Sequence, residues 1–328
     1  MRFLAPWAAL AASLPLAAQN WYVPDNVATT GTCNVVPFGS IVGSSFAQVK
    51  YQQRCTAAEL GSAANLVTGL GFASCGTSRG HYDSIEIVVD HIPPTQALST
   101  TFANNLTPAA QVVLSATNYT WNVVGNTWNE IGLQVPFVYN GIDDLVVQIT
   151  VVNAVNALAG FHRGTRQRIM WNAANGTPPA TGTSSNAANK IEVSMLMART
   201  SSHGDGCPGS NGTPAVAPNG TAQPGNTIGI DLANGVPNGV ALLLAGTTNG
   251  VPFPFDLGTF GAPGCFAYTD LGLTALAVLD PTGAGTFPIA IPPALVGFRF
   301  FAQYAVLDLP ANAFGFTTSN YLNVHVGN

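Results

Sequence analysis

Residues 145–152 read LVVQITVV, a continuous run of mostly β-branched side chains. A run this short, set between turn-forming residues, predicts a strand buried within a sheet. Residues 85–90 (IEIVVD) alternate apolar and polar side chains, which is the pattern of a half-buried strand. Residues 128–133 and 191–197 show similar patterns, and turn signals such as NG at 140–141 separate the runs. This half of the chain therefore predicts short strands joined by turns.

Strand patterns continue towards the C-terminus. A Gly- and Pro-rich segment at 201–226 marks a predicted domain boundary, and strand patterns follow it at 227–232, 239–245, 266–269, 275–279, 286–291, 298–307 and 321–326. Many short strands separated by turns are typical of sandwiches and barrels. The predicted fold class is all-β, with two β-sandwich (jelly-roll-like) domains in tandem, at residues 19–200 and 201–328.

Charged side chains are scarce in this sequence. The 10 Lys and Arg and the 15 Asp and Glu make up 8% of the 328 residues, whereas an ordinary domain carries about 25%. The hydrophobic fraction of 47% is ordinary and argues against intrinsic disorder. The formal net charge of −5 argues against nucleic acid as a partner, because phosphate binding requires a basic surface.

The N-terminus has the features of a secretory signal peptide. Arg2 precedes an apolar run that extends to Ala18 and ends in small residues. We therefore predict a signal peptide at residues 1–18 and a secreted protein, located extracellularly or at the cell surface. No later stretch has about 18 uninterrupted apolar residues, so no transmembrane segment is predicted after signal removal.

Export makes disulfides the expected state of the five cysteines. Cys207 and Cys265 stand alone in the C-terminal third, so if they form a bridge they pair with each other. Cys33, Cys55 and Cys75 allow three pairings. We favour Cys55–Cys75, because the strand pattern at residues 66–73 would return the chain between them, and Cys33 is then left as the free thiol. No CxxC motif is present to indicate a zinc or redox site.

Several motifs resemble those of a known group of proteins. In the C-terminal third they are GCPGSNGTP at 206–214, PGNTIGIDL at 224–232, PNGVALLLAG at 237–246, PGC at 263–265, IPPALVGFRFFAQYAVLD at 291–308 and SNYLNVHVG at 319–327. In the N-terminal part they are CNVVPFG at 33–39, TGLGF at 68–72, TFANNL at 101–106 and PFVYNGIDDLVVQI at 136–149. Together they resemble uncharacterised secreted two-module β-sandwich proteins of environmental bacteria.

The resemblance implies secretion, a β-sandwich architecture and a C-terminal module with paired cysteines, here Cys207 and Cys265. It carries over no catalytic residue, because its motifs consist mostly of Gly, Pro and apolar residues that serve folding. The chain departs from the pattern in having Cys55 and Cys75. A bridge in the N-terminal part is therefore not implied by the resemblance.

Sequence motifs of enzymes and metal sites are absent. The chain has no GxSxG, HExxH, Walker, EF-hand or GxGxxG motif, and its five histidines lack ligand-like spacing. We therefore predict no catalytic residue, no cofactor and no metal ligand set. Asp143 and Asp144 are weak calcium candidates, because oxygen-rich turns can bind that ion. The alternative for this pair is a solvated turn before a strand.

Two groups of residues favour glycan binding. Arg163, Arg166 and a third arginine, Arg168, form the one dense basic cluster, and guanidinium groups bind carboxylates or sulfates of acidic polysaccharides. Trp121 and Trp128 are close in sequence and could stack on sugar rings. We take Trp121, Trp128, Arg163 and Arg166 as candidate glycan-binding residues. The alternative is that the rings fill the core and the arginines are paired or solvated.

The leading functional hypothesis is a secreted, non-enzymatic structural or surface/matrix protein that associates with itself or with envelope material. Low net charge opposes association only weakly, and the chain offers few candidate catalytic groups. One alternative is an extracellular carbohydrate-binding protein, and a second is an unrecognised extracellular hydrolase. The predicted partners are a second copy of the chain or extracellular and cell-envelope polysaccharide.

Overall fold

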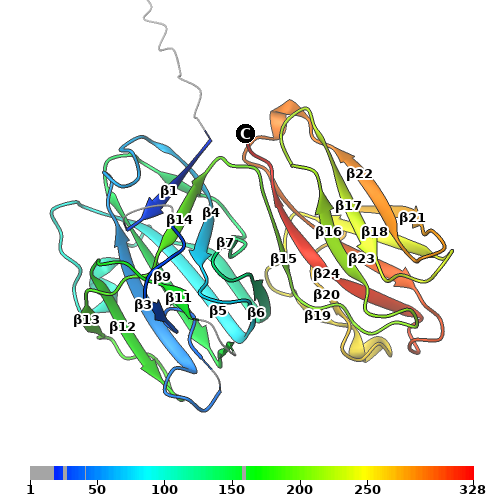
Figure 1. Cartoon of the computed structure of the whole chain (residues 1–328), viewed down its shortest axis with the longest axis horizontal. Helices are drawn as coiled ribbons and strands as arrows, with labels where there is room; N and C mark the ends of the chain where they lie inside the picture. Colours follow the sequence, from blue (N-terminus) through cyan, green and yellow to red (C-terminus); the bar gives the residue numbers. More distant parts are fainter. Residues whose placement is uncertain (1–17, 25–27, 41, 157–159) are drawn as a thin grey trace, which may run out of the picture.

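The computed structural model describes residues 18–24, 28–40, 42–156 and 160–328. Nearly all of its regular structure is β, so the all-β prediction is confirmed. Figure 1 shows two lobes side by side. We call β1–β14 the N-terminal lobe and β16–β24 the C-terminal lobe, with β15 (Arg199–His203) between them. The predicted signal peptide falls almost wholly on residues 1–17, which lie outside the described residues. Within the described ranges, no helix is long and apolar enough to cross a membrane.

The N-terminal lobe is made of short and long strands, most of which lie in two facing sheets. They are β1 (Gln19–Val23), β2 (Cys33–Asn34), β3 (Gln48–Cys55), β4 (Asn65–Ala73), β5 (Ser78–Ile92), β6 (Gln111–Val123), β7 (Trp128–Glu130), β8 (Phe137–Tyr139), β9 (Asp144–Val152), β10 (Val155–Asn156), β11 (Phe161–His162), β12 (Arg168–Ala173), β13 (Thr183–Ser185) and β14 (Ile191–Met195). One sheet has the order β1-β14-β4-β7, and β8 also pairs with β4. The facing layer has the order β13-β12-β3-β9-β5-β6, and β10 also pairs with β5. β2 and β11 form a separate two-stranded sheet.

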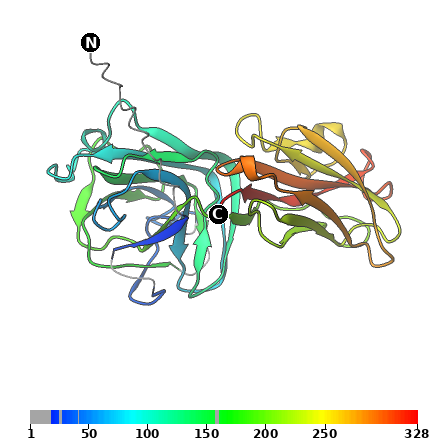
Figure 2. The ribbon, with the colours of Figure 1, turned by 90° about the horizontal axis from the view of Figure 1, so that it is seen from above.

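The C-terminal lobe is a smaller pair of layers. Its strands are β16 (Ala215–Asn219), β17 (Thr227–Ala233), β18 (Val240–Gly246), β19 (Phe255–Asp256), β20 (Phe266–Ala267), β21 (Leu273–Val278), β22 (Gly285–Ala290), β23 (Arg299–Leu307) and β24 (Phe316–His325). The described residues also contain three short 3-10 helices, one in the N-terminal lobe at Phe102–Asn105 and two in the C-terminal lobe at Leu257–Phe260 and Pro293–Leu295. The order β16-β17-β22 faces the order β15-β24-β23-β18-β21. Figure 2 shows this lobe from above, with the C-terminus lying between the two lobes.

One sheet runs through both lobes. Its order is β13-β12-β3-β9-β5-β6-β15-β24-β23-β18-β21, and the step from β6 to β15 rests on the single pair Trp121↔His203. Each lobe nevertheless has a separate apolar core: one cluster draws on residues 23–195 and the other on residues 216–326. The predicted division into two domains at residue 200 agrees with these clusters but stays a prediction.

The cysteine pairing is partly as predicted. Cys207–Cys265 forms, whereas the predicted Cys55–Cys75 bridge is wrong: Cys75 is bonded to Cys33, and Cys55 is a buried free thiol. The error has a geometric cause. A strand of nine residues, β4, separates Cys55 from Cys75, and at about 3.3 Å per residue it carries the chain away rather than returning it. The two disulfides fit a protein of an oxidising, extracellular environment.

Candidate functional site

The indole rings of Trp121 and Trp128, the candidate glycan-binding residues, do not form an exposed platform. Trp121 is 2% exposed, stacks on Phe161 with ring centroids 5.6 Å apart, and donates its indole N–H to the carbonyl of Glu130 at 2.9 Å. Its ring therefore belongs to the core, and its selection as a sugar platform is corrected. Trp128 is half-buried, with its ring centroid 5.1 Å from that of Tyr22.

The basic cluster is divided among separate contacts. Arg166 forms an ion pair with Glu59, and buried Arg168 donates to Ser185 Oγ at 2.9 Å. Arg163 is half-buried, and its backbone bridges to Asn189. The three guanidinium groups thus do not act as one exposed trio, because the Arg166 and Arg168 groups already have partners in the fold.

The calcium candidates are committed to structural roles. Asp144 is buried and accepts hydrogen bonds from the Arg54 side chain and from the backbone N–H of Ala57. Asp143 accepts from Asn140 Nδ2 at 2.7 Å within the turn before β9. The ion pair with Arg54 neutralises the carboxylate that a calcium ion would need, so the calcium interpretation is corrected.

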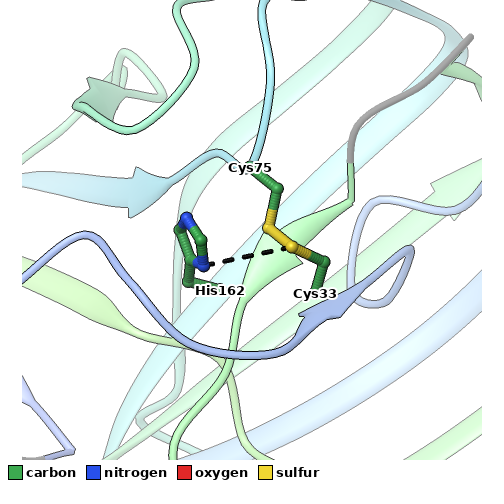
Figure 3. A group of neighbouring side chains, drawn as sticks. All are labelled: Cys33, Cys75 and His162. Carbon is green, nitrogen blue, oxygen red and sulfur yellow. Dashed lines mark hydrogen bonds between the residues drawn. A yellow bond between two sulfur atoms is a disulfide. The ribbon is translucent and has the colours of Figure 1, made fainter.

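A third group of side chains was not predicted from the sequence. Cys33, Cys75 and His162 each offer a potential ligand atom, and these three atoms all lie within 4.8 Å of one another. Figure 3 shows the His162 ring beside the Cys33–Cys75 bond. His162 Nδ1 lies 4.0 Å from Cys33 Sγ, and His162 is 5% exposed. No sequence motif signals the group, because 42 residues separate the two cysteines and the fold alone brings the histidine to them.

Polar side chains are buried where the lobes meet. Arg299 of β23 donates to the carbonyls of Leu133 and Thr68, so it ties the C-terminal lobe to the N-terminal one. Burial lowers the pKa of Arg299 to about 10. Burial also raises the pKa of the nearby Glu130 to about 7, although Arg199 and Arg299 oppose the shift. Burial of charge is unfavourable, so this layer is sensitive to protonation.

A histidine in the same region resembles an acid–base centre but is enclosed. His203 Nδ1 lies 2.8 Å from the Tyr119 hydroxyl, and its Nε2 lies 2.7 Å from Ser201 Oγ. The His203 ring packs against the ring of Tyr321 from the other lobe. Burial lowers the pKa of His203 to about 3, so the ring is neutral at ordinary pH. Enclosure and aromatic packing give this group a structural role in joining the lobes.

The strand β21 lies at the end of the long sheet. It pairs with β18 on one side, and among the described residues no strand pairs with its other side. The surrounding sequence, residues 271–279, reads LGLTALAVL and contains neither charge nor proline. Such a strand presents free backbone N–H and C=O groups to any further strand.

The outward face next to this edge is apolar. Ala277 of β21 points into the lobe's core, so Leu276 and Val278 point outward, and they are 61% and 74% exposed. Cross-strand pairing places Leu242 beside Leu276, and Val240 beside Val278. The same lobe also has an apolar groove, whose lining includes Leu273, Ile291, Leu295, Phe298 and Phe300. We call Val240, Leu242, Leu276 and Val278, with the free edge of β21, the β21 surface.

No protein-family model matches the chain, and no curated protein matches it. The resemblance to secreted two-module proteins therefore stays a prediction, and the geometry of the chain itself must carry any functional assignment.

Proposed function

We propose that this protein is an extracellular structural component that associates with itself through the β21 surface. The observation that carries the proposal is the uncharged, apolar edge strand β21, one side of which pairs with no strand of the described residues. Soluble proteins usually protect such edges with charge, proline or a covering segment. An edge that lacks these devices within the strand favours pairing with another strand.

A second copy of the same chain is the partner that this edge fits best. Two β21 strands related by a two-fold axis can pair antiparallel, so that the same residues contribute from both sides. Leu276 and Val278 of each copy then extend the apolar rows that already contain Leu242 and Val240. All side chains of β21 are neutral, so pairing of two β21 strands buries no charge.

Charge also favours this lobe as the contact region. After β15 the chain contains six Asp, no Glu and a single basic residue, Arg299, which is buried between the lobes. No cation is therefore exposed on the C-terminal lobe to bind an acidic partner. This argues for an apolar contact and against an acidic polysaccharide as the ligand of the β21 surface.

Light scattering on the purified chain over a range of concentrations tests the proposal. We expect a mass that rises with concentration, and we expect the double substitution L276K/V278K to weaken association roughly 10-fold or more, because it places like charges opposite each other. Val138→Lys is the matched control, since Val138 is also an exposed apolar strand residue (69%) but lies in the N-terminal lobe. A chain that is monomeric at all concentrations, or equal weakening by Val138→Lys, would contradict the proposal.

A further inference from the structure

The backbone holds Cys33, Cys75 and His162 together independently of the bond between the sulfurs. β2 pairs with β11 so that Cys33 lies opposite His162. The backbone N–H of Cys75 donates to the carbonyl of Gly160 at 3.1 Å, immediately before β11. The three side chains therefore remain neighbours when the disulfide is opened. Cys33 is exposed and Cys75 half-buried, so a small reductant can reach the bond.

We propose that reduction of Cys33–Cys75 creates a zinc site whose ligands are the two thiolates and His162 Nδ1. A dithiol opens the bond by attack of one thiolate on a protein sulfur, and its second thiolate then releases the protein and leaves as a cyclic disulfide. The protein gains two electrons and two protons in this exchange. Zn²⁺ then displaces the two thiol protons, and a water completes four-coordination.

The distances suit this ligand set. Zinc binds Cys sulfur at about 2.3 Å and His nitrogen at about 2.0–2.1 Å, so tetrahedral geometry sets ligand atoms roughly 3.6–3.8 Å apart. His162 Nδ1 already lies 4.0 Å from Cys33 Sγ. The two sulfurs are bonded to each other in the oxidised protein, so they must move apart to reach the tetrahedral spacing. Cys33 is exposed and lies in the two-residue strand β2, so its side chain has solvent beside it into which it can move.

His162 has a hydrogen-bond acceptor beside each ring nitrogen, which suits both the oxidised and the zinc-bound protein. In the oxidised protein Nδ1–H can donate to the carbonyl of Gly31, which lies 3.1 Å away. When Nδ1 binds zinc, the proton is on Nε2, which lies 3.2 Å from Asn126 Oδ1 and can donate to it. A metal-bound histidine usually donates its second ring N–H to such an oxygen, which fixes the ring. Asn126 is thus a positioning residue for the proposed site.

The other disulfide does not offer the same site. Cys207 and Cys265 are 1% and 2% exposed, and Cys207 Sγ accepts a hydrogen bond from the backbone N–H of Thr318. Among the residues that the structure describes, only the Cys33, Cys75 and His162 group has a metal-like arrangement of His, Cys, Asp and Glu. Mild reduction should therefore open the accessible bond first.

Zinc binding by the full chain tests the proposal. The Cys55→Ala background removes the remaining free thiol, a water-soluble phosphine serves as reductant, and a chromophoric chelator competes for Zn²⁺. We expect one zinc per reduced chain and none per oxidised chain. His162→Ala should weaken binding at least about 10-fold, and Asn126→Ala about 10-fold or more. His81→Ala is the matched control and should leave zinc affinity unchanged, because His81 lies outside the group.

Cobalt provides a readout that does not depend on a histidine variant. Co²⁺ added to the reduced Cys55→Ala chain should give the visible absorbance of tetrahedral thiolate coordination, and Zn²⁺ should abolish that absorbance. Adding Cys75→Ser should remove the signal. A reduced chain that binds no stoichiometric zinc, or that binds it equally well without His162, would overturn the proposal.

Discussion

The two ends of the long sheet are built in opposite ways. At one end β13 has three residues, Thr183–Ser185, all polar. At the other end β21 has six residues, LTALAV, with no charge. Short and polar edges resist pairing with other chains, whereas long apolar edges promote it. The comparison indicates that one edge is protected and the other is left available.

The two lobes that carry these edges also differ in their charged side chains. All four ion pairs identified among the described residues involve an arginine of the N-terminal lobe or of β15, such as Arg54–Asp144 and Arg199–Glu192. The surface of the C-terminal lobe has no cation to place beside its aspartates, because its one basic residue, Arg299, is buried. Charges of both signs keep the surface of the N-terminal lobe solvated, whereas the surface of the C-terminal lobe relies on neutral polar residues for solvation.

The largest predicted effect concerns the junction between the lobes. Because burial raises the pKa of Glu130 from 4.5 to about 7, the folded protein retains a proton there that the unfolded chain has released. This contribution to stability is fully present below about pH 4.5 and is lost as pH rises through about 7. At about 1.4 kcal/mol per pKa unit, it amounts to about 3 kcal/mol.

Urea unfolding at pH 5 and pH 8 measures this effect. The wild-type chain should lose stability between the two values, and Glu130→Gln, which does not titrate, should lose up to about 3 kcal/mol less over the same range. Equal losses in the two proteins would show that Glu130 does not control the junction. In that case the lobes would be joined mainly by contacts such as those of Arg299.

A smaller effect concerns the aspartates that flank the available edge. Asp270 and Asp280 lie on either side of residues 271–279, so an antiparallel pair of β21 strands brings Asp270 of one copy towards Asp280 of the other. Hydrogen bonds from Thr282 and Ala284 lower the pKa of Asp280, which keeps it charged at neutral pH. Salt screens the repulsion between Asp270 and Asp280. Raising the salt concentration from 0.05 to 0.5 M should therefore strengthen association roughly twofold. Asp280→Asn should reduce that salt dependence, and unchanged or weaker association in salt would argue against this register.

Periodicity predicted much of the fold, and its failures have a physical reason. β5, β9 and most strands of the C-terminal lobe follow apolar patterns in the sequence. β3 was missed because Gln52 and Gln53 are fully buried there, where their side chains hydrogen-bond with Gln148 and with the carbonyl of Asn189. A pattern that assumes polar residues face water cannot detect such a strand.

The candidate sites were harder to predict than the fold. The strand at 275–279 was predicted, but its place at the end of a sheet depends on topology, which no local pattern encodes. The Cys33 pairing and its contact with His162 likewise arise from strands distant in sequence. Trp121 was misassigned because sequence spacing does not show which face of a sheet a ring occupies.

Hydrogen exchange at the two edges tests the central claim most directly. Backbone amides of residues 273–278 and 183–185 are compared in dilute and concentrated samples of the same chain. If β21 pairs with a second copy, exchange at 273–278 slows as concentration rises, while exchange at 183–185 does not change. Exchange at 273–278 that is independent of concentration, in samples whose mass increases, would contradict the assignment of self-association to the β21 surface.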